Sequence, residues 1–404
     1  MPELRGIDYL RHKLNQKRAR VLTRYKYYNM KNVTKDLSGV IPKNFLWLRP
    51  VLGWCAKAAD SIADRVVLEG FENDGLGIGE IYELNSMNVL TDSSIISAVI
   101  SSCSFIYVFM GDSDYPRLQS IDGSNATGTI DPTTRMLTEG YAVLERDNGG
   151  APKTEAYFTP EGTWIYREGT EPVMYDNPTD YALLVPVIHR PDPTRPFGRS
   201  RISRACMSLT DSAIRTLKRS EVSAEFYSFP QKYILGLDPE ADQLDKWKAT
   251  ISSLLQFDKD SEGDHPVLGQ FQQQSMAPYN DQLRTIASVF AGETGLTLDD
   301  LGFSTQNPTT EEAIRASHET LRRSAKKAQR DMSSGFLNAG YLAACLRDNY
   351  KYDLSILAQT KAVYEPVFEP DAGQLSGLGD AVQKIQQSFP DYFDEKKLHR
   401  LTGL

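Results

Sequence analysis

Alternating carboxylates provide the sharpest candidate for metal chemistry in this sequence. Asp258, Asp260 and Glu262 are followed by Gly263, a spacing that matches the first half of a calcium-binding EF-hand loop. Such a loop needs a bidentate glutamate at its twelfth position, and this chain has Gly269 there. The favoured interpretation is therefore a plain acidic turn, and a calcium site is the weaker alternative.

Other motifs that would indicate catalysis are absent from the sequence. It contains neither a GxxxxGK[ST] phosphate loop nor a GxSxG nucleophile elbow, and Asp112 and Asp114 are typical of a surface turn. The five histidines show no metal-ligand spacing: His12, His189, His265, His318 and His399. Catalytic triads need not be contiguous in sequence, so the absence of these motifs does not by itself exclude catalysis. We nevertheless predict a protein that is not an enzyme, with no catalytic residue, no metal and no cofactor.

Positive charge is concentrated at the start of the chain. The net charge is −8, but residues 1–31 hold nine basic residues against two acidic ones, which makes this segment +7 and the remainder −15. A basic arm can bind nucleic acid or an acidic protein surface. The favoured alternative is a solvated helix face, because Leu10, Leu14 and Val21 lie among the charges at helical spacing. The acidic remainder argues against a protein that grips duplex DNA through many phosphates.

Length and composition indicate a soluble globular protein with more than one domain. The 404 residues exceed what one hydrophobic core usually fills, and 40% of them are hydrophobic against 24% charged. The first residues lack the apolar stretch of a secretory signal, and four scattered cysteines are typical of reduced intracellular thiols. Residues 93–111 are uncharged and long enough to suggest a membrane span. Their serines favour a core helix, capped at Thr91 and Asp92, and the β-branched and aromatic residues of the second half favour a buried strand after it.

The first half of the chain predicts an α+β domain. A helix is expected from Pro50 and a strand over 65–71, and residues 139–189 show antiparallel strands, of which 155–159 and 163–167 form the clearest pair. Pro186 restricts the segment 183–188 to the edge of a sheet.

The second half predicts long helices with a small module between two of them. One helix is expected from Ser200 to about Tyr227, then strands at 231–236 and 266–270 around a helix at 243–255. A second helix runs from Asn280 and closes at Gly292 and Gly295, and a loop covers 294–308. A third helix starts at the capping box Thr309-x-x-Glu312, breaks at Ser333-Ser334-Gly335 and resumes through 336–346, and the last helix starts near Gln374.

Four stretches in a fixed order give this plan a recognisable character. They are Leu84–Val108, with its helix-then-strand pattern; Val185–Gly236, which holds Phe197-Gly198-Arg199-Ser200, the long helix and Phe229-Pro230-Gln231; Gly295–Phe303, followed by Asn307-Pro308; and Gly379–Lys384, before a Phe-Pro helix pair. From the first to the last they span about three quarters of the chain, and the second is the most specific. The ordered set resembles the portal proteins of tailed double-stranded-DNA bacteriophages.

The resemblance implies an α+β portal-type fold with an α/β wing, two long stem helices, a small α/β clip between them, a tunnel loop and a helical C-terminal crown. The implied boundaries are a basic N-terminal arm at 1–30, the wing at 31–199, stem helix one at 200–229, the clip at 230–279, stem helix two at 280–293, the tunnel loop at 294–308, a wing helix and strand at 309–369 and the crown at 370–404.

The tunnel loop is the first candidate site. Its polar residues include Thr297, Asp299, Asp300, Ser304 and Gln306, and the loop contains no Lys or Arg. Each phosphate that a basic side chain neutralises adds a salt-dependent hold on DNA, so an acidic loop would let a duplex slide. The alternative is that Asp299 and Asp300 merely turn or cap the loop, and Leu298, Leu301 and Phe303 are expected to anchor its base.

Two further groups of residues are candidates for contacts with other proteins. The acidic turn of the clip, at Asp258, Asp260, Glu262 and Asp264, is predicted to dock a basic partner, with a merely solvated turn as the alternative. Partly apolar second faces of the stem helix predict contacts with a neighbouring subunit through Ile202, Met207, Ile214 and Val222.

The resemblance also implies the assembly and its partners. The chain would form a ring of about twelve copies at one vertex of the capsid, assembled in the host cytoplasm and kept in the virion, with no membrane partner. The terminase large subunit, a head–tail adaptor and the major capsid and scaffolding proteins would bind it, and double-stranded DNA would pass through it during packaging and ejection. The alternative functions are a nucleic-acid-processing enzyme of the phage head and a helical scaffold.

Overall fold

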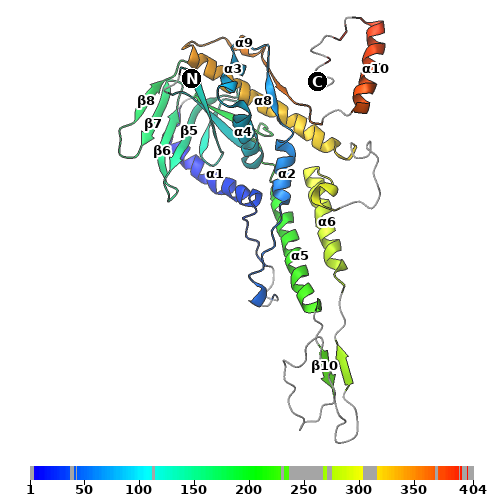
Figure 1. Cartoon of the computed structure of the whole chain (residues 1–404). Helices are drawn as coiled ribbons and strands as arrows, with labels where there is room; N and C mark the ends of the chain where they lie inside the picture. The colour runs from blue at the N-terminus through cyan, green and yellow to red at the C-terminus, as the bar shows by residue number, and fades with distance from the viewer. Residues whose placement is uncertain are drawn as a thin grey trace, which may run out of the picture. The chain divides into compact units, whose positions relative to one another are not determined.

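A computed structural model describes most of the chain, namely residues 4–36, 41, 43–111, 114–228, 232–235, 267–270, 275–303, 316–368, 372–390, 392–393 and 398 (Figure 1). The chain divides into two compact units. The first contains Met1–Val33, Leu52–Thr210 and Ala287–Leu404, and the second contains Thr34–Val51 and Asp211–Ile286. The expected mixture of helices and sheets is confirmed, whereas the boundaries of arm, wing, stem, clip and crown stay predictions.

The first unit combines helices with three sheets. Its helices are α1 (Ile7–Tyr28), α2 (Trp54–Ala63), α3 (Ile78–Glu83), α4 (Met87–Ser101), α8 (Glu319–Arg347), α9 (Leu354–Leu357) and α10 (Ala372–Ser388). Its strands are β1 (Leu68–Glu72), β2 (Cys103–Met110), β3 (Pro116–Ile121), β4 (Ala126–Ile130), β5 (Leu137–Arg146), β6 (Pro152–Phe158), β7 (Gly162–Arg167), β8 (Val173–Asp176), β9 (Leu184–Ile188) and β12 (Lys361–Tyr364). The antiparallel sheets have the orders β3-β2-β9, β4-β5-β6-β7-β8 and β1-β12.

The three-stranded sheet is covered on both faces. Successive side chains of a strand point to opposite faces. Ser104 donates a hydrogen bond to the carbonyl of Ser94 in α4, whereas the ring of Tyr107 packs 5.0 Å from that of Phe158 in the five-stranded sheet. Helices α4 and α8 both pack on strands of this sheet (Figure 1). The uncharged segment 93–111 is therefore a core helix and a core strand, as predicted, although α4 already starts at Met87 and not after Thr91 and Asp92.

Helix α1 agrees with the favoured alternative for the basic segment 1–31, which is a helix with Leu10, Leu14 and Val21 at helical spacing. Leu10 and Leu14 are buried against Tyr141 and Val143 of β5, and Val21 is buried as well. Arg11 binds the Glu155 carboxylate at 2.7 Å. The segment is a helix packed on the five-stranded sheet, because its three apolar side chains share one face.

Helix α8 is one continuous helix where the sequence predicts a break. Its 29 residues run through Gly335, which was expected to interrupt it. A Cβ at Gly335 would lie 2.9 Å from the carbonyl oxygen of Pro186 and 3.0 Å from Cα of Val187, so this glycine lets the helix approach β9 closely. Gly340 does the same against Ile78 of α3, where a Cβ would clash with Cγ2. Both glycines serve packing and not helix termination.

Other predicted elements are present with shifted ends. Helix α2 starts at Trp54 and not at Pro50, and Gly292 lies inside α6 (Ala277–Thr294), which ends before Gly295. The predicted hairpin of β6 and β7 pairs Tyr157 with Trp164. The predicted edge strand β9 lies at the edge of its sheet. The capping box Thr309-x-x-Glu312 lies outside the described residues.

The second unit contains most of α5 (Arg204–Ser228), the start of α6, the short helix η1 (Lys43–Phe45) and the strands β10 (Lys232–Leu235) and β11 (Val267–Gln270). The sequence predicts both strands, and the structure pairs them antiparallel. The helix expected at 243–255 lies outside the described residues. The extended chain beside α5 is fixed by hydrogen bonds from Thr34 to Asp211 and from Lys218 to Asp36, both at 2.8 Å.

The structure also bears on the state of the cysteines and on a possible membrane span. The four cysteines are free and buried. Among the described helices, none has the length and apolar character that crossing a bilayer requires.

Candidate functional site

The described part of the predicted tunnel loop is a compact folded turn. Helix α6 ends at Thr294, and the next residue, Gly295, reverses the chain with a φ of +66°. A Cβ at Gly295 would lie 2.8 Å from Cγ2 of Thr320. The turn then forms the short helix η2 (Asp299–Leu301). Leu301 is buried, and the Phe303 ring lies 6.5 Å from that of Trp54, so the predicted anchoring of the base holds for these two residues.

Asp300 closes this turn by a reciprocal pair of bonds with Thr297. Its carboxylate accepts hydrogen bonds from the backbone N–H and the hydroxyl of Thr297, both at 2.9 Å, and Thr297 Oγ1 accepts the N–H of Asp300 at 3.1 Å. The carboxylate also lies 3.3 Å from Nε2 of His318. Burial alone would raise the pKa of Asp300, but the bonds from Thr297 and the adjacent His318 outweigh burial and lower it. Asp300 therefore stays ionised as a structural cap.

Asp299 has a different environment from its neighbour. Its side chain is exposed, whereas that of Asp300 is only 21% accessible. The capping alternative thus describes Asp300, and Asp299 is the carboxylate that the turn presents to its surroundings. Ser304 and Gln306, the other predicted loop residues, lie outside the described residues, as do the predicted docking residues Asp258, Asp260, Glu262 and Asp264.

The base of the turn is held by a buried arginine that the sequence analysis missed. Arg201 is 8% exposed, and its guanidinium donates to the carbonyl of Thr294, at the end of α6, and to the carbonyl of Ala58 in α2 at 3.2 Å. Burial lowers the pKa of Arg201 to about 10, so it stays charged at neutral pH. Its position next to the Phe197–Ser200 motif was the only sequence signal, and His318 had none because it lies far from Asp300 in sequence.

The Phe197–Ser200 motif docks the start of α5 onto the sheet. Gly198 has a φ of +73°, and a Cβ there would clash with the carbonyl oxygen of His189. Ser200 donates to the carbonyl of Ile100 at 2.6 Å. The buried His189 ring bonds through Nδ1 to the Arg199 carbonyl at 2.7 Å, and burial lowers its pKa to about 4. The motif is therefore a rigid connection between β9 and α5.

The four residues predicted to contact a neighbouring subunit differ in exposure. Ile202, Ile214 and Val222 are at most 7% exposed within the single chain, and Met207 is half-buried. Ile202 also precedes α5, which begins at Arg204. The three buried side chains already have partners, so their apolar character no longer argues for a neighbour. Their predicted role at a subunit interface stays a prediction.

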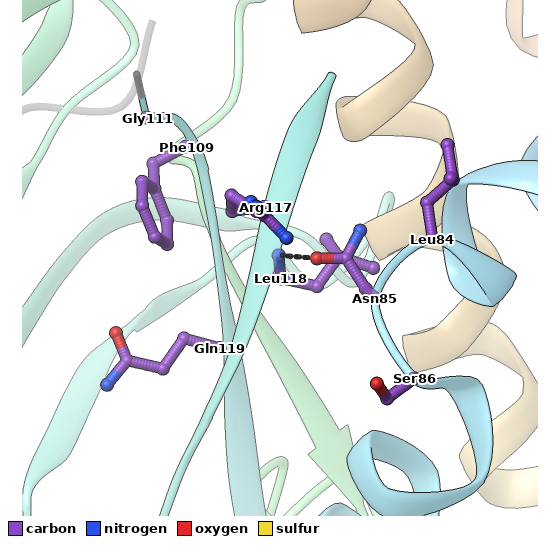
Figure 2. Close-up of a pocket in the computed structure, with 8 residues that line it drawn as sticks. All are labelled: Leu84, Asn85, Ser86, Phe109, Gly111, Arg117, Leu118 and Gln119. Carbon is purple, nitrogen blue, oxygen red and sulfur yellow. Dashed lines mark hydrogen bonds between the residues drawn. The ribbon is translucent and has the colours of Figure 1, made fainter. Parts of the chain in front are cut away.

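A surface pocket in the first unit lacks a catalytic arrangement. It has a volume of about 470 Å³ and lies between the turn joining α3 to α4 and the strands β2 and β3. Figure 2 shows Asn85 beside β3, where its Oδ1 accepts the N–H of Leu118 at 3.0 Å, and its Nδ2 donates to the carbonyl of Pro116 at 2.9 Å. Arg117 is the one charged residue of the lining, and its guanidinium lies 4.4 Å from the Tyr115 ring centroid. In the described part of the chain, no group of three acidic, histidine or cysteine side chains is arranged to hold a metal.

Comparisons with known proteins find two curated relatives. No family model matches the chain. Two curated proteins, the portal protein of Mycobacterium phage L5 and that of Mycobacterium phage D29, are each 25% identical over 328 residues. Each match covers 75% of this chain and 66% of the relative, so the chain matches slightly less than two thirds of the relatives' length.

Solved structures give a more distant likeness. The neck of a native gene transfer agent particle is 13% identical, with a TM-score of 0.44, and covers 95% of this chain and 99% of that chain. The neck of the empty particle is also 13% identical, with a TM-score of 0.45 and 93% of this chain covered against 97% of that chain. The two curated matches confirm the resemblance that the ordered motifs predict: the chain is similar to phage portal proteins.

Proposed function

We propose that the chain is the subunit of a portal ring at one vertex of a phage capsid. In this role it is a structural protein of the virion and no enzyme. The ring is the channel through which double-stranded DNA is packaged and ejected. The observation that carries this proposal is the match to two mycobacteriophage portal proteins over 328 residues.

The order of elements in the second half supports the channel role. Helix α5 has 25 residues, which gives it a length of about 37 Å, and the strand pair β10–β11 lies between α5 and α6 in the sequence. A helix of this length is suited to line a channel wall. The turn after α6 has no basic residue between Gly295 and Phe303 and exposes Asp299. We assign the repulsion of DNA to the Asp299 carboxylate and the shape of the turn to Asp300 and Thr297.

The partners follow from the same proposal. The terminase large subunit docks on the ring during packaging, and a head–tail adaptor takes its place afterwards. Major capsid and scaffolding proteins surround the ring as the particle assembles in the host cytoplasm. The acidic residues Asp258, Asp260, Glu262 and Asp264 are the proposed docking surface for a basic partner, and such docking weakens as salt rises.

Electron microscopy of the purified full chain tests the proposal. Closed rings with a central opening are the expected images, and mass photometry at the same concentration should give a single large assembly. Monomers or dimers at every concentration would overturn the ring. Cleavage of duplex DNA that depends on magnesium would favour the alternative of a nucleic-acid-processing enzyme.

A further inference from the structure

A row of positive side chains follows one face of α1. Lys13, Lys17, Arg20 and Arg24 are spaced four, three and four residues apart, which places them on the same side of the helix over three turns. At 1.5 Å per residue, the row is about 16 Å long. The row lies beside the apolar face of α1, on which Leu14 is buried against the sheet. The row is therefore fixed in place by the fold.

Three of these side chains are recessed against groups that cannot neutralise them. The ammonium of Lys17 lies 5.1 Å from the ring centroid of Phe105 and 5.9 Å from that of Phe197. Lys13 donates to the carbonyl of Gly128 at 2.7 Å, and Arg24 donates to the carbonyl of Ser101 at 3.1 Å. Ring faces and carbonyls orient a cation but leave its charge in place.

Two carboxylates attract cations of the row without pairing with them: Glu139 acts on Lys13 and Asp122 acts on Lys17, and both make their hydrogen bonds with other groups. Glu139 accepts hydrogen bonds from the backbone of Arg5 and Gly6 and from Thr129, and Asp122 accepts bonds from Ser124 and Asn125. Within the described ranges, none of the four cations of the row forms an ion pair. Half-buried cations without a carboxylate are costly to a fold, so the row points to an anion from outside the chain.

A second segment adds to the same positive field. Arg195, in the connection between β9 and α5, is exposed and close enough to Arg24 to repel it. Burial lowers the pKa values of Lys13, Lys17 and Arg24, and the neighbouring Arg20 and Arg195 lower that of Arg24 further. Folding thus gathers five cations from two segments that are about 170 positions apart, a juxtaposition that the sequence does not reveal.

We propose that this cationic row, Lys13, Lys17, Arg20 and Arg24 together with Arg195, binds the phosphate backbone of duplex DNA. A duplex carries one negative charge per about 1.7 Å of its axis, so the row faces a dense line of phosphates along its whole length. A protein partner would instead need apolar contacts at the centre of its interface. The centre of this row is Lys17, whose aromatic neighbour Phe105 is fully buried.

The inference goes beyond the channel proposed above. The turn at Asp299 is assigned to let DNA slide, whereas the row holds DNA by contacts that depend on salt. The holding contact does not require a ring, and the two proposals fail separately. A chain that binds DNA but stays monomeric overturns the portal ring alone, and a ring without this binding overturns the row alone.

The test measures the affinity of the full-length chain for a fluorescent 16-base-pair duplex by anisotropy, at several salt concentrations. The test variant is Arg20→Gln/Arg195→Gln, because both side chains are exposed and their loss spares the core. The matched control is Lys26→Gln/Lys31→Gln, which removes the same charge from exposed positions off the row. Loss of two phosphate contacts should reduce the slope of log affinity against log salt by about 1.8. The affinity at 0.1 M salt should fall about tenfold relative to the control.

The outcomes separate clearly. A smaller salt slope in the test variant than in the control supports the row as a phosphate site, and Lys17→Met should then weaken binding as well. Equal slopes in test and control variants would overturn the proposal, as would a wild-type chain that fails to bind the duplex. Binding to poly-glutamate but not to the duplex would also overturn it and identify an acidic protein surface as the partner.

Discussion

Replacing Asp300 by alanine should loosen the turn after α6, while the same change at Asp299 should not. Asp300→Ala removes the acceptor of two 2.9 Å hydrogen bonds from Thr297 and the partner of His318. Loss of a side-chain cap of this kind costs about 1 kcal/mol, and leaving the Thr297 donors without a partner raises the cost to about 2 kcal/mol. Asp299→Ala removes the same charge from an exposed position and is the matched control.

Hydrogen exchange of the full chain, followed by mass spectrometry of a peptide covering 295–303, measures this difference. A cost of about 1 to 2 kcal/mol corresponds to a loss of protection of about five- to thirtyfold in Asp300→Ala, confined to this peptide and to its contact at Trp54. The pKa of Asp300 is lowered in the folded state, so its contribution is present above the ordinary carboxyl pKa and is lost as pH falls through the folded value. Protection in the wild type should therefore fall under acidic conditions towards that of the variant. Equal exchange in Asp300→Ala and Asp299→Ala at neutral pH would refute the capping role.

Three further outcomes follow from buried groups of the first unit. The pKa of His189 falls from 6.5 to about 4 on folding, so the unfolded chain binds a proton more readily than the folded chain does. The free energy of unfolding should therefore be highest above about pH 6.5 and should drop by about 3 kcal/mol by pH 4. Thermal unfolding of His189→Asn should lack this pH dependence. In Arg201→Lys the shorter side chain cannot reach the carbonyls of both Ala58 and Thr294, so the variant should lose about 2 to 3 kcal/mol of stability in thermal unfolding. The control Arg204→Lys changes an exposed position and should lose almost nothing. Equal melting temperatures of the two variants would contradict the bridging role of Arg201. Gly340→Ala should reduce stability by about 1 to 3 kcal/mol because its Cβ would clash with Ile78. The Cβ of Gly377→Ala in α10 meets no atom within 4 Å, so this control should be neutral or stabilising by about 0.5 kcal/mol. A Gly340→Ala variant as stable as the wild type would show that α8 can move away from α3.

Periodic patterns predicted the elements of this fold well. The change from helix to strand within 93–111 was readable because polar serines lie among the apolar residues of the helix, whereas the strand is rich in β-branched and aromatic residues. The edge position of β9 was readable from Pro186, since proline removes one ladder hydrogen bond. Both predictions rest on local chemistry, which a sequence displays directly.

Tertiary contacts explain what the sequence could not provide. Gly335 was interpreted as a helix break because glycine has a low helical propensity, but its actual reason is the close backbone of Pro186, which lies about 150 positions earlier. The two neighbouring carboxylates Asp299 and Asp300 look alike in sequence, and only the folded turn separates a cap from an exposed charge. The spacing of Leu10 and Leu14 indicates a helix in the basic segment 1–31 but not what the helix packs on, because the sheet that receives these residues is formed more than 100 positions later.

The side chain of Asn85 imitates a neighbouring strand at the open edge of β3. It offers an acceptor to the N–H of Leu118 and a donor to the carbonyl of Pro116, the two groups that another strand would use to extend the sheet. At the opposite edge, Pro186 withholds one of the donors of β9. A three-stranded sheet guarded in this way resists edge-to-edge aggregation. The proposed ring brings many copies of the chain close together around one axis. Blocked sheet edges would prevent neighbouring copies from pairing through their strands, so that assembly depends on specific side-chain contacts.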